Sequence, residues 1–221
     1  MTFLASLLSP GPTVLAAMVA AGLHAPDAAC APAMGPAVDD ELRAIYHAGR
    51  SYADFLGAAT RRTELWEGNT ERASEIDAEI IQRARAVGGT WYFLAVAVDS
   101  CSDSVSTIPY LAHLVDRVDG LNLRIVDSSV GRSIMETHRT PDGRAATPTV
   151  LLLDREFDEA GCFIERPPEL QTWILENSEW SGQQVYERKM EWYDDDAGQG
   201  TVEAFVEMLE AAARGGDGIC R

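Results

Sequence analysis

The chain has 221 residues, of which 46% are hydrophobic, and this suits one compact domain with an extension or two small domains. Eighteen basic residues against 35 acidic ones give a formal net charge of −17. A field of that sign repels phosphate backbones and anionic lipid, so the composition argues against nucleic-acid and membrane partners.

The first 37 residues form an apolar segment of ambiguous role. Residues 3–25 are mostly apolar and small residues follow, as in a secretory signal, but the first basic residue is Arg43. Two prolines interrupt the run, and for this reason it is also a poor match to a transmembrane helix. We therefore expect a cytoplasmic protein. Export through a non-standard signal and a start site assigned too early are the alternatives.

Residues 38–89 predict a helical extension. A first helix is expected to begin near Asp39 and to continue through Leu56, with apolar side chains on one face. Thr70 is a candidate N-cap for a second helix, which is expected to end at Gly88.

Strands and helices alternate over residues 90–214. Residues 91–98 are a continuous apolar run, typical of a buried parallel strand. Alternation predicts parallel pairing, and a closing hairpin adds an antiparallel pair. The sequence therefore predicts an α/β domain with a mixed sheet flanked by helices. The further expected elements are a helix over 104–118, a strand over 121–126, a short helix over 133–137, strands over 149–153 and 162–164, and helices after residue 168 and over 202–209.

Cys101 follows the first expected strand and opens the next helix. The first turn of a helix carries unpaired N–H groups and a partial positive charge, and both stabilise a thiolate. Thiolate is the form that attacks disulfides. Asp99 and Asp103 flank the thiol, and their negative charge opposes this effect. The position predicts a redox-active cysteine, with an inert packed cysteine as the alternative.

Three features in register resemble the thioredoxin family. Residues 98–104, Val-Asp-Ser-Cys-Ser-Asp-Ser, look like the Trp-Cys-x-x-Cys active-site segment. Pro109 stands where thioredoxins carry a proline that kinks the active-site helix, and Thr147-Pro148-Thr149 looks like their cis-proline strand. The resemblance implies a thioredoxin-like fold, a cis peptide bond before Pro148 and thiol–disulfide oxidoreductase activity.

A narrower resemblance is to bacterial thioredoxin-family proteins with a Trp-Cys-Gly-Asp active site. They keep an aspartate where Asp103 stands, a Gly-Arg pair like residues 143–144 and a proline-rich segment like residues 166–168. Residues 48–52, Ala-Gly-Arg-Ser-Tyr, are similar to part of their N-terminal helix. On this comparison the resemblance covers most of residues 39–214.

The active-site segment departs from the family pattern at three positions. Ser100 stands for the tryptophan, Ser102 for the glycine and Ser104 for the second cysteine, so the chain has no local resolving thiol. Any exchange reaction would therefore follow a monothiol route. The resemblance implies catalytic roles at Cys101, Ser104 and Pro148, and substrate contacts at Ser100, Ser102, Asp103 and Thr147.

The other cysteines, Cys30, Cys162 and Cys220, form no Cys-x-x-Cys pair and no cluster at zinc-ligand spacing. We therefore expect no disulfide framework, no metal and no cofactor. Cys162 could resolve Cys101 only if the fold brought the two together, and a buried small hydrophobe is its simpler interpretation. Residues 194–196, three aspartates, do not match a calcium loop and are expected to form a solvated turn.

Two functions remain open from the sequence. The first is a thiol–disulfide oxidoreductase, or a thiol-based redox protein, that acts through Cys101 on a protein or low-molecular-weight thiol or disulfide. The second is a redox-inactive module that keeps the thioredoxin fold and binds a protein partner near Pro148 and Trp173. The loss of the tryptophan, the glycine and the second cysteine supports this alternative.

Overall fold

The computed structural model describes residues 38–216 and 219–220. The apolar segment interpreted as a signal or an early start lies outside the described residues. Within the described part of the chain, no helix is long and apolar enough to cross a membrane.

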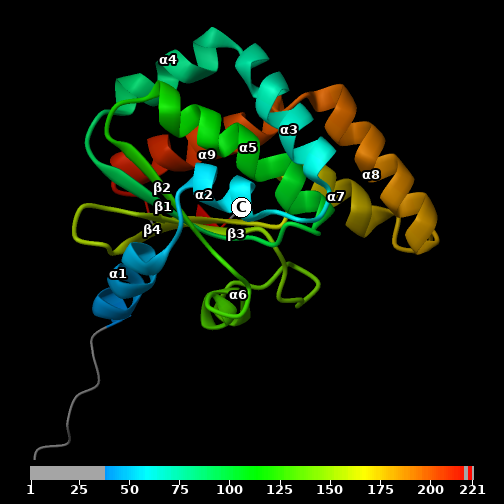
Figure 1. Ribbon diagram of the computed structural model, residues 1–221, viewed down its shortest axis with the longest axis horizontal. Helices are drawn as coiled ribbons and strands as arrows, with labels where there is room; N and C mark the ends of the chain where they lie inside the picture. The colour runs from blue at the N-terminus through cyan, green and yellow to red at the C-terminus, as the bar shows by residue number, and fades with distance from the viewer. Residues whose placement is uncertain (1–37, 217–218, 221) are drawn as a thin grey trace, which may run out of the picture. The chain divides into compact units, whose positions relative to one another are not determined.

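A mixed sheet forms the centre of the domain (Figure 1). In the described residues it has five strands, in the order β2-β1-β3-β4-β5. The β1–β2 and β4–β5 pairs are parallel, whereas β1–β3 and β3–β4 are antiparallel. This arrangement confirms the predicted mixed sheet. The strands are β1 (Trp91–Val96), β2 (Leu121–Val126), β3 (Thr149–Leu153), β4 (Glu159–Ile164) and β5 (Ile219–Cys220).

The direction of β3 differs from the parallel pairing that the alternation predicts. A parallel crossover needs a helix that carries the chain back along the whole strand. The connecting helix α6 (Arg132–Thr137) has only six residues, so it is about 9 Å long, shorter than its neighbouring strands. The chain instead re-enters the sheet at Thr149, opposite Val96 at the end of β1, so β3 runs against β1.

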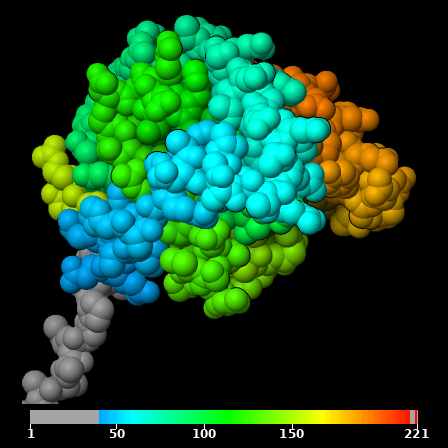
Figure 2. All heavy atoms as spheres, in the orientation of Figure 1, coloured from blue at the N-terminus to red at the C-terminus, as the bar shows by residue number. Residues whose placement is uncertain are grey.

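Helices cover both faces of the sheet (Figure 1). α1 and α6 pack on one face, and α5 and α9 pack on the other, with α2, α3 and α4 alongside. In the space-filling view, the segment from α1 to α3 forms the surface at the centre of the face shown (Figure 2). The remaining helices are α1 (Val38–Ala48), α2 (Tyr52–Ala58), α3 (Thr63–Arg72), a 3₁₀ turn (Ala73–Glu75), α4 (Ala78–Val87), α5 (Ser102–Arg117), α7 (Pro168–Glu176), α8 (Gly182–Asp196) and α9 (Gln199–Ala213).

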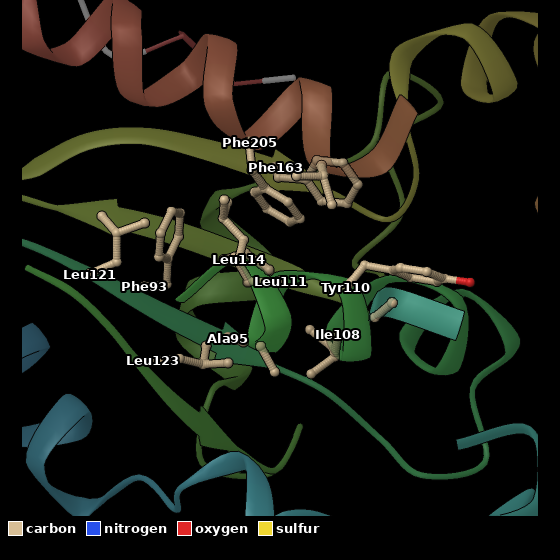
Figure 3. Packing of buried hydrophobic residues seen from close by; sticks show 14 of the residues in the cluster. Phe93, Ala95, Ile108, Tyr110, Leu111, Leu114, Leu121, Leu123, Phe163 and Phe205 are labelled. Atoms are coloured by element: carbon tan, nitrogen blue, oxygen red, sulfur yellow. The ribbon is translucent and has the colours of Figure 1, made fainter. Parts of the chain in front are cut away.

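Two hydrophobic clusters sandwich the sheet, because successive side chains of a strand point to opposite faces. In β1, Phe93 faces the cluster under α5 and α9, whereas Leu94 faces the cluster under α1 and α6. Figure 3 shows Phe205 of α9 beside Phe163 of β4 in the first cluster. This packing holds β1 and α5 in place, and the turn between them carries Cys101.

The helix boundaries correct two predictions. Thr70 lies inside α3, where its hydroxyl donates to the Trp66 carbonyl, and it caps no helix. Asp77 caps α4 instead, because its carboxylate accepts from the Glu79 amide at 2.8 Å.

The expected turn over residues 194–196 is also wrong, since these aspartates end α8. Sequence periodicity missed α8 because this helix has no apolar stripe. Its buried residues are Lys189 and Tyr193.

Candidate functional site

Cys101 is the N-cap of α5, as its position in the sequence predicts. Its backbone is extended, with φ −79° and ψ 126°, and its Sγ accepts from the Ser104 amide at 3.5 Å. The side chain is half-buried, and it is the free cysteine of the described residues. The sulfur therefore lies at the positive end of α5, within reach of an N–H group that favours a thiolate.

The loop before β3 faces the thiol. The Thr147–Pro148 peptide bond is cis, which confirms the expectation for Pro148. The Cys101 thiol donates to the Thr147 carbonyl at 3.1 Å, and Pro148 is buried. The structure thus brings Cys101, Ser104, Thr147 and Pro148 together from two distant segments.

Ser104 occupies the position of the second cysteine and is fully buried. Its amide contacts the Cys101 sulfur, and its hydroxyl accepts from the Val98 amide at 3.5 Å. The side chain therefore supports the turn between β1 and α5, and a hydroxyl cannot resolve a disulfide formed at Cys101.

Asp99 is tied to the loop between α2 and α3. Its Oδ2 accepts from the amides of Thr60 at 2.9 Å and Arg61 at 3.1 Å. These hydrogen bonds, with that from Thr60 the largest cause, lower the pKa of the Asp99 carboxyl below its usual 3.8. The charge that was expected to oppose the thiolate is therefore held by two N–H groups.

The same loop holds the backbone that precedes the thiol. Arg62 Nε donates to the Ser100 carbonyl at 2.7 Å, and the buried Trp66 indole donates to the Asp99 carbonyl at 3.0 Å. Sequence reasoning missed this clamp because its residues lie nearly forty positions before the site.

The hydrogen bonds to Asp99 predict a pH-dependent contribution to stability. A carboxyl with a lowered pKa in the folded state stabilises the protein above about pH 3.9, and this contribution is lost as the pH falls through the folded value. We expect Asp99→Asn to be less stable than the wild type at pH 7 by about 1 kcal/mol or less, because solvent screens this carboxylate. In urea unfolding, the difference should shrink as the pH is lowered below the usual Asp value of 3.8. A difference that persists unchanged would contradict this explanation.

Asp103, on the first turn of α5, is buried among cations and a hydroxyl. Its carboxylate accepts from Lys189 Nζ at 2.7 Å and from the Tyr193 hydroxyl at 3.0 Å, and it lies 3.4 Å from Arg166 Nε. Burial, and then the Asp103 charge, raise the pKa of Tyr193 well above 10, so its hydroxyl stays protonated and donates. These contacts compensate the Asp103 charge inside the protein.

This charged network reaches the cis-proline loop. Arg166 pairs with Glu165, which in turn accepts two hydrogen bonds from Arg144, at 2.8 and 3.0 Å. The Glu165 amide donates to the Pro148 carbonyl at 2.7 Å. The network therefore joins the start of α5 to the loop that faces the thiol. Two of its arginines, Arg144 and Arg166, belong to the segments that carry the resemblance.

The four residues expected to contact substrate differ in their exposure to solvent. Ser100 is exposed and Thr147 is half-buried beside the sulfur. Ser102 is buried, and its hydroxyl accepts from Lys189 Nζ at 2.9 Å, while Asp103 lies in the network.

Lys189 itself was missed by sequence reasoning. The signal that could have found it is the Lys-x-x-x-Tyr spacing, which places it with Tyr193 on one face of a polar helix.

Cys162 and Cys220 form a disulfide, which corrects two predictions. Cys162 is no isolated hydrophobe, and in this state it offers no thiol to resolve Cys101. The bond closes a separation of 58 residues. It follows from the pairing of β4 with the short β5, which sets the two cysteines directly side by side.

The mixed sheet, the cysteine at the start of α5 and the cis-proline facing it define a thioredoxin-like domain. The family model described as Thioredoxin matches residues 49–184, so the chain belongs to the thioredoxin family. No curated protein matches the chain.

Two solved structures share the fold. A protein of unknown function from Pseudomonas aeruginosa superposes with a TM-score of 0.57 and 19% identity, covering 76% of this chain and 96% of that one. An HIV epitope-scaffold superposes with a TM-score of 0.56 and 18% identity, covering 76% of this chain and 97% of that one. At this identity the likeness shows the fold alone.

Proposed function

We propose that the protein is a thiol–disulfide oxidoreductase that acts through the single thiol of Cys101. The observation that carries this proposal is the position of Sγ at the N-terminus of α5, where it accepts from the Ser104 amide and lies beside the cis-Pro148 loop. A helix N-terminus is a usual setting for nucleophilic cysteines, and the half-buried side chain of Cys101 leaves a side open to a substrate. The substrate class is a protein or low-molecular-weight disulfide.

The reaction has two exchanges. The Cys101 thiolate attacks one sulfur of the substrate disulfide, so that a mixed disulfide forms and the other sulfur leaves as a thiolate. An external thiolate then attacks the substrate sulfur of the mixed disulfide and releases Cys101 as a thiolate. One S–S bond forms and one breaks in each step, and the external thiol supplies the resolving sulfur that Ser104 lacks.

The experiment is transfer of glutathione between a small disulfide and reduced glutathione. In a Cys30→Ser background, oxidised glutathione should modify Cys101 with one equivalent, seen by peptide mass mapping, and reduced glutathione should remove it. Cys101→Ser should lower turnover by orders of magnitude, because it removes the nucleophile. Ser106→Ala, which changes a buried serine on the same helix, is the matched control.

The alternative is the protein-binding module without redox chemistry. It is favoured by the hydrogen bond from the Cys101 thiol to the Thr147 carbonyl, because this contact engages the thiol within the fold. This alternative predicts that folded protein resists glutathione and that Cys101→Ser leaves partner binding unchanged.

We also propose a cytoplasmic location, because the apolar N-terminal run carries no basic residue before Arg43, and export is the alternative. The Cys162–Cys220 disulfide favours export, because disulfides persist mainly in oxidising compartments. Cell fractionation of the full chain, with N-terminal sequencing of the product, separates the two.

A further inference from the structure

Four potential metal ligands gather at one edge of the sheet, in a cluster that does not include Cys101. His138 follows α6, Glu159 and Cys162 lie on β4, and Cys220 lies on β5. One ligand atom from each residue, an imidazole nitrogen, a carboxylate oxygen and two sulfurs, lies within 4.8 Å of the others. Zinc ligands of these types meet at a comparable spacing, about 3.3–3.8 Å, when bonds of about 2.0–2.3 Å point to the corners of a tetrahedron.

His138 is already oriented as a metal ligand. Its Nδ1 lies 2.9 Å from the Ile134 carbonyl, and its Nε2 lies 2.8 Å from Glu159 Oε1. A histidine ligand commonly donates one ring N–H to a backbone carbonyl, which fixes the ring and leaves the other nitrogen for the metal. The contact with Ile134 fits that arrangement, and it leaves Nε2 beside Glu159, another residue of the cluster.

The two cysteines are brought to the cluster by strand pairing. Cys162 and Cys220 are partners in the parallel β4–β5 register, so their sulfurs meet on the same face of the sheet. Cys162 is fully buried, whereas Glu159 and Cys220 are exposed. A cavity of about 320 Å³, which His138 and Glu159 help to line, adjoins the cluster. An ion therefore has a route to these residues without unfolding of the core.

We propose that, once Cys162 and Cys220 are reduced, the protein binds a zinc-type divalent ion through His138, Glu159 and the two cysteines. Two thiolates with an imidazole and a carboxylate form a four-coordinate donor set suited to Zn²⁺. The disulfide and the metal complex are then alternative states of the same two sulfurs, so the site is a redox switch. This proposal does not depend on the chemistry of Cys101.

The switch balances as follows. A dithiol reductant gives two electrons and two protons to the Cys162–Cys220 bond, which becomes two thiols while the reductant becomes a disulfide. Zn²⁺ then displaces the two thiol protons and binds the thiolates. In the reverse direction, a disulfide oxidant accepts two electrons, the S–S bond re-forms and the ion leaves.

Cobalt is a suitable probe, because tetrahedral thiolate-bound Co²⁺ gives visible and sulfur-to-metal charge-transfer absorption. The full chain carrying Cys30→Ser and Cys101→Ser, which leave only this pair of cysteines, is reduced with a phosphine and titrated with Co²⁺. We expect one equivalent to bind with both bands in the reduced protein and no such bands in the oxidised protein. Zn²⁺ should displace the cobalt.

Variants assign the ligands. Cys220→Ser and His138→Gln should each weaken Co²⁺ binding by about tenfold or more, whereas His113→Gln, a histidine on α5, should not. Cys220→Ser changes an exposed residue of a two-residue strand, so the core should stay folded, as circular dichroism can check. Equal cobalt binding in the oxidised and reduced states, absence of the charge-transfer band after reduction, or unchanged affinity in Cys220→Ser would overturn the proposal.

Discussion

Replacing Lys189 by methionine is expected to lower the free energy of unfolding by about 3 kcal/mol. Lys189 is buried and donates to both Asp103 and Ser102, at 2.7 and 2.9 Å. Removing one partner of a buried ion pair leaves the other charge without compensation, which costs about 3–5 kcal/mol. Tyr193 and Arg166 still contact Asp103, so the lower end of that range applies here.

Urea unfolding followed by tryptophan fluorescence measures this loss. The matched control is Arg188→Met on the same helix, whose side chain is 47% exposed and forms an ion pair with Glu191. Exposed pairs contribute about 0–1 kcal/mol, so this variant should be nearly neutral.

A double variant separates lost charge pairing from lost packing. The double variant Asp103→Asn, Lys189→Met should lose less stability than the sum of the two single variants. Each single change leaves the other residue's buried charge without its partner, whereas the double change removes both charges. Additive losses would mean that Lys189 stabilises α8 by packing alone.

The network also explains why α8 belongs to the site although it carries no apolar stripe. Its inner face binds the first turn of α5 through Asp103, and Glu165 continues the network to the Pro148 carbonyl. Lys189→Met is therefore expected to loosen the loop that faces the thiol as well as the helix. Faster hydrogen exchange of the Glu165 amide, which donates to that carbonyl, would report this effect.

Local sequence signals were sufficient to place Cys101, because its position depends on the strand and the helix that adjoin it. The apolar run of β1 and the polar turn after it placed Cys101 at a helix N-terminus, and the structure has it as the N-cap of α5. The cis bond before Pro148 was expected from resemblance, since periodicity carries no information about peptide isomers.

The remaining features depend on contacts between distant segments. Cys162 meets Cys220 only because a two-residue strand pairs with β4, and so short a strand has no recognisable period. The clamp from Trp66 and the ion pair from Lys189 each join residues more than thirty positions apart. The direction of β3 likewise depends on a pairing between distant segments, since Thr149 at its start lies opposite Val96 at the end of β1.

Ser104→Cys is expected to convert the site into a dithiol one. Positions 101 and 104 lie one helical turn apart, and the Ser104 amide already contacts the Cys101 sulfur at 3.5 Å. The new thiol would resolve the mixed disulfide within the molecule. Well-oriented intramolecular groups exceed molar effective concentrations, so release of the bound thiol should be faster by about a hundredfold or more than with millimolar external thiol.

The measurement is release of a coloured thiol from a mixed disulfide at Cys101, in the Cys30→Ser background and without external thiol. Ser106→Cys is the matched control, because it introduces a thiol in the same helix two residues further on, where the chain has turned to another face. That variant should release no thiol. If Ser104→Cys also releases none and forms no internal disulfide, the sulfur of Cys101 does not face position 104 in solution. The monothiol mechanism would then lose its geometric basis, because the same contact places the sulfur at the helix N-terminus.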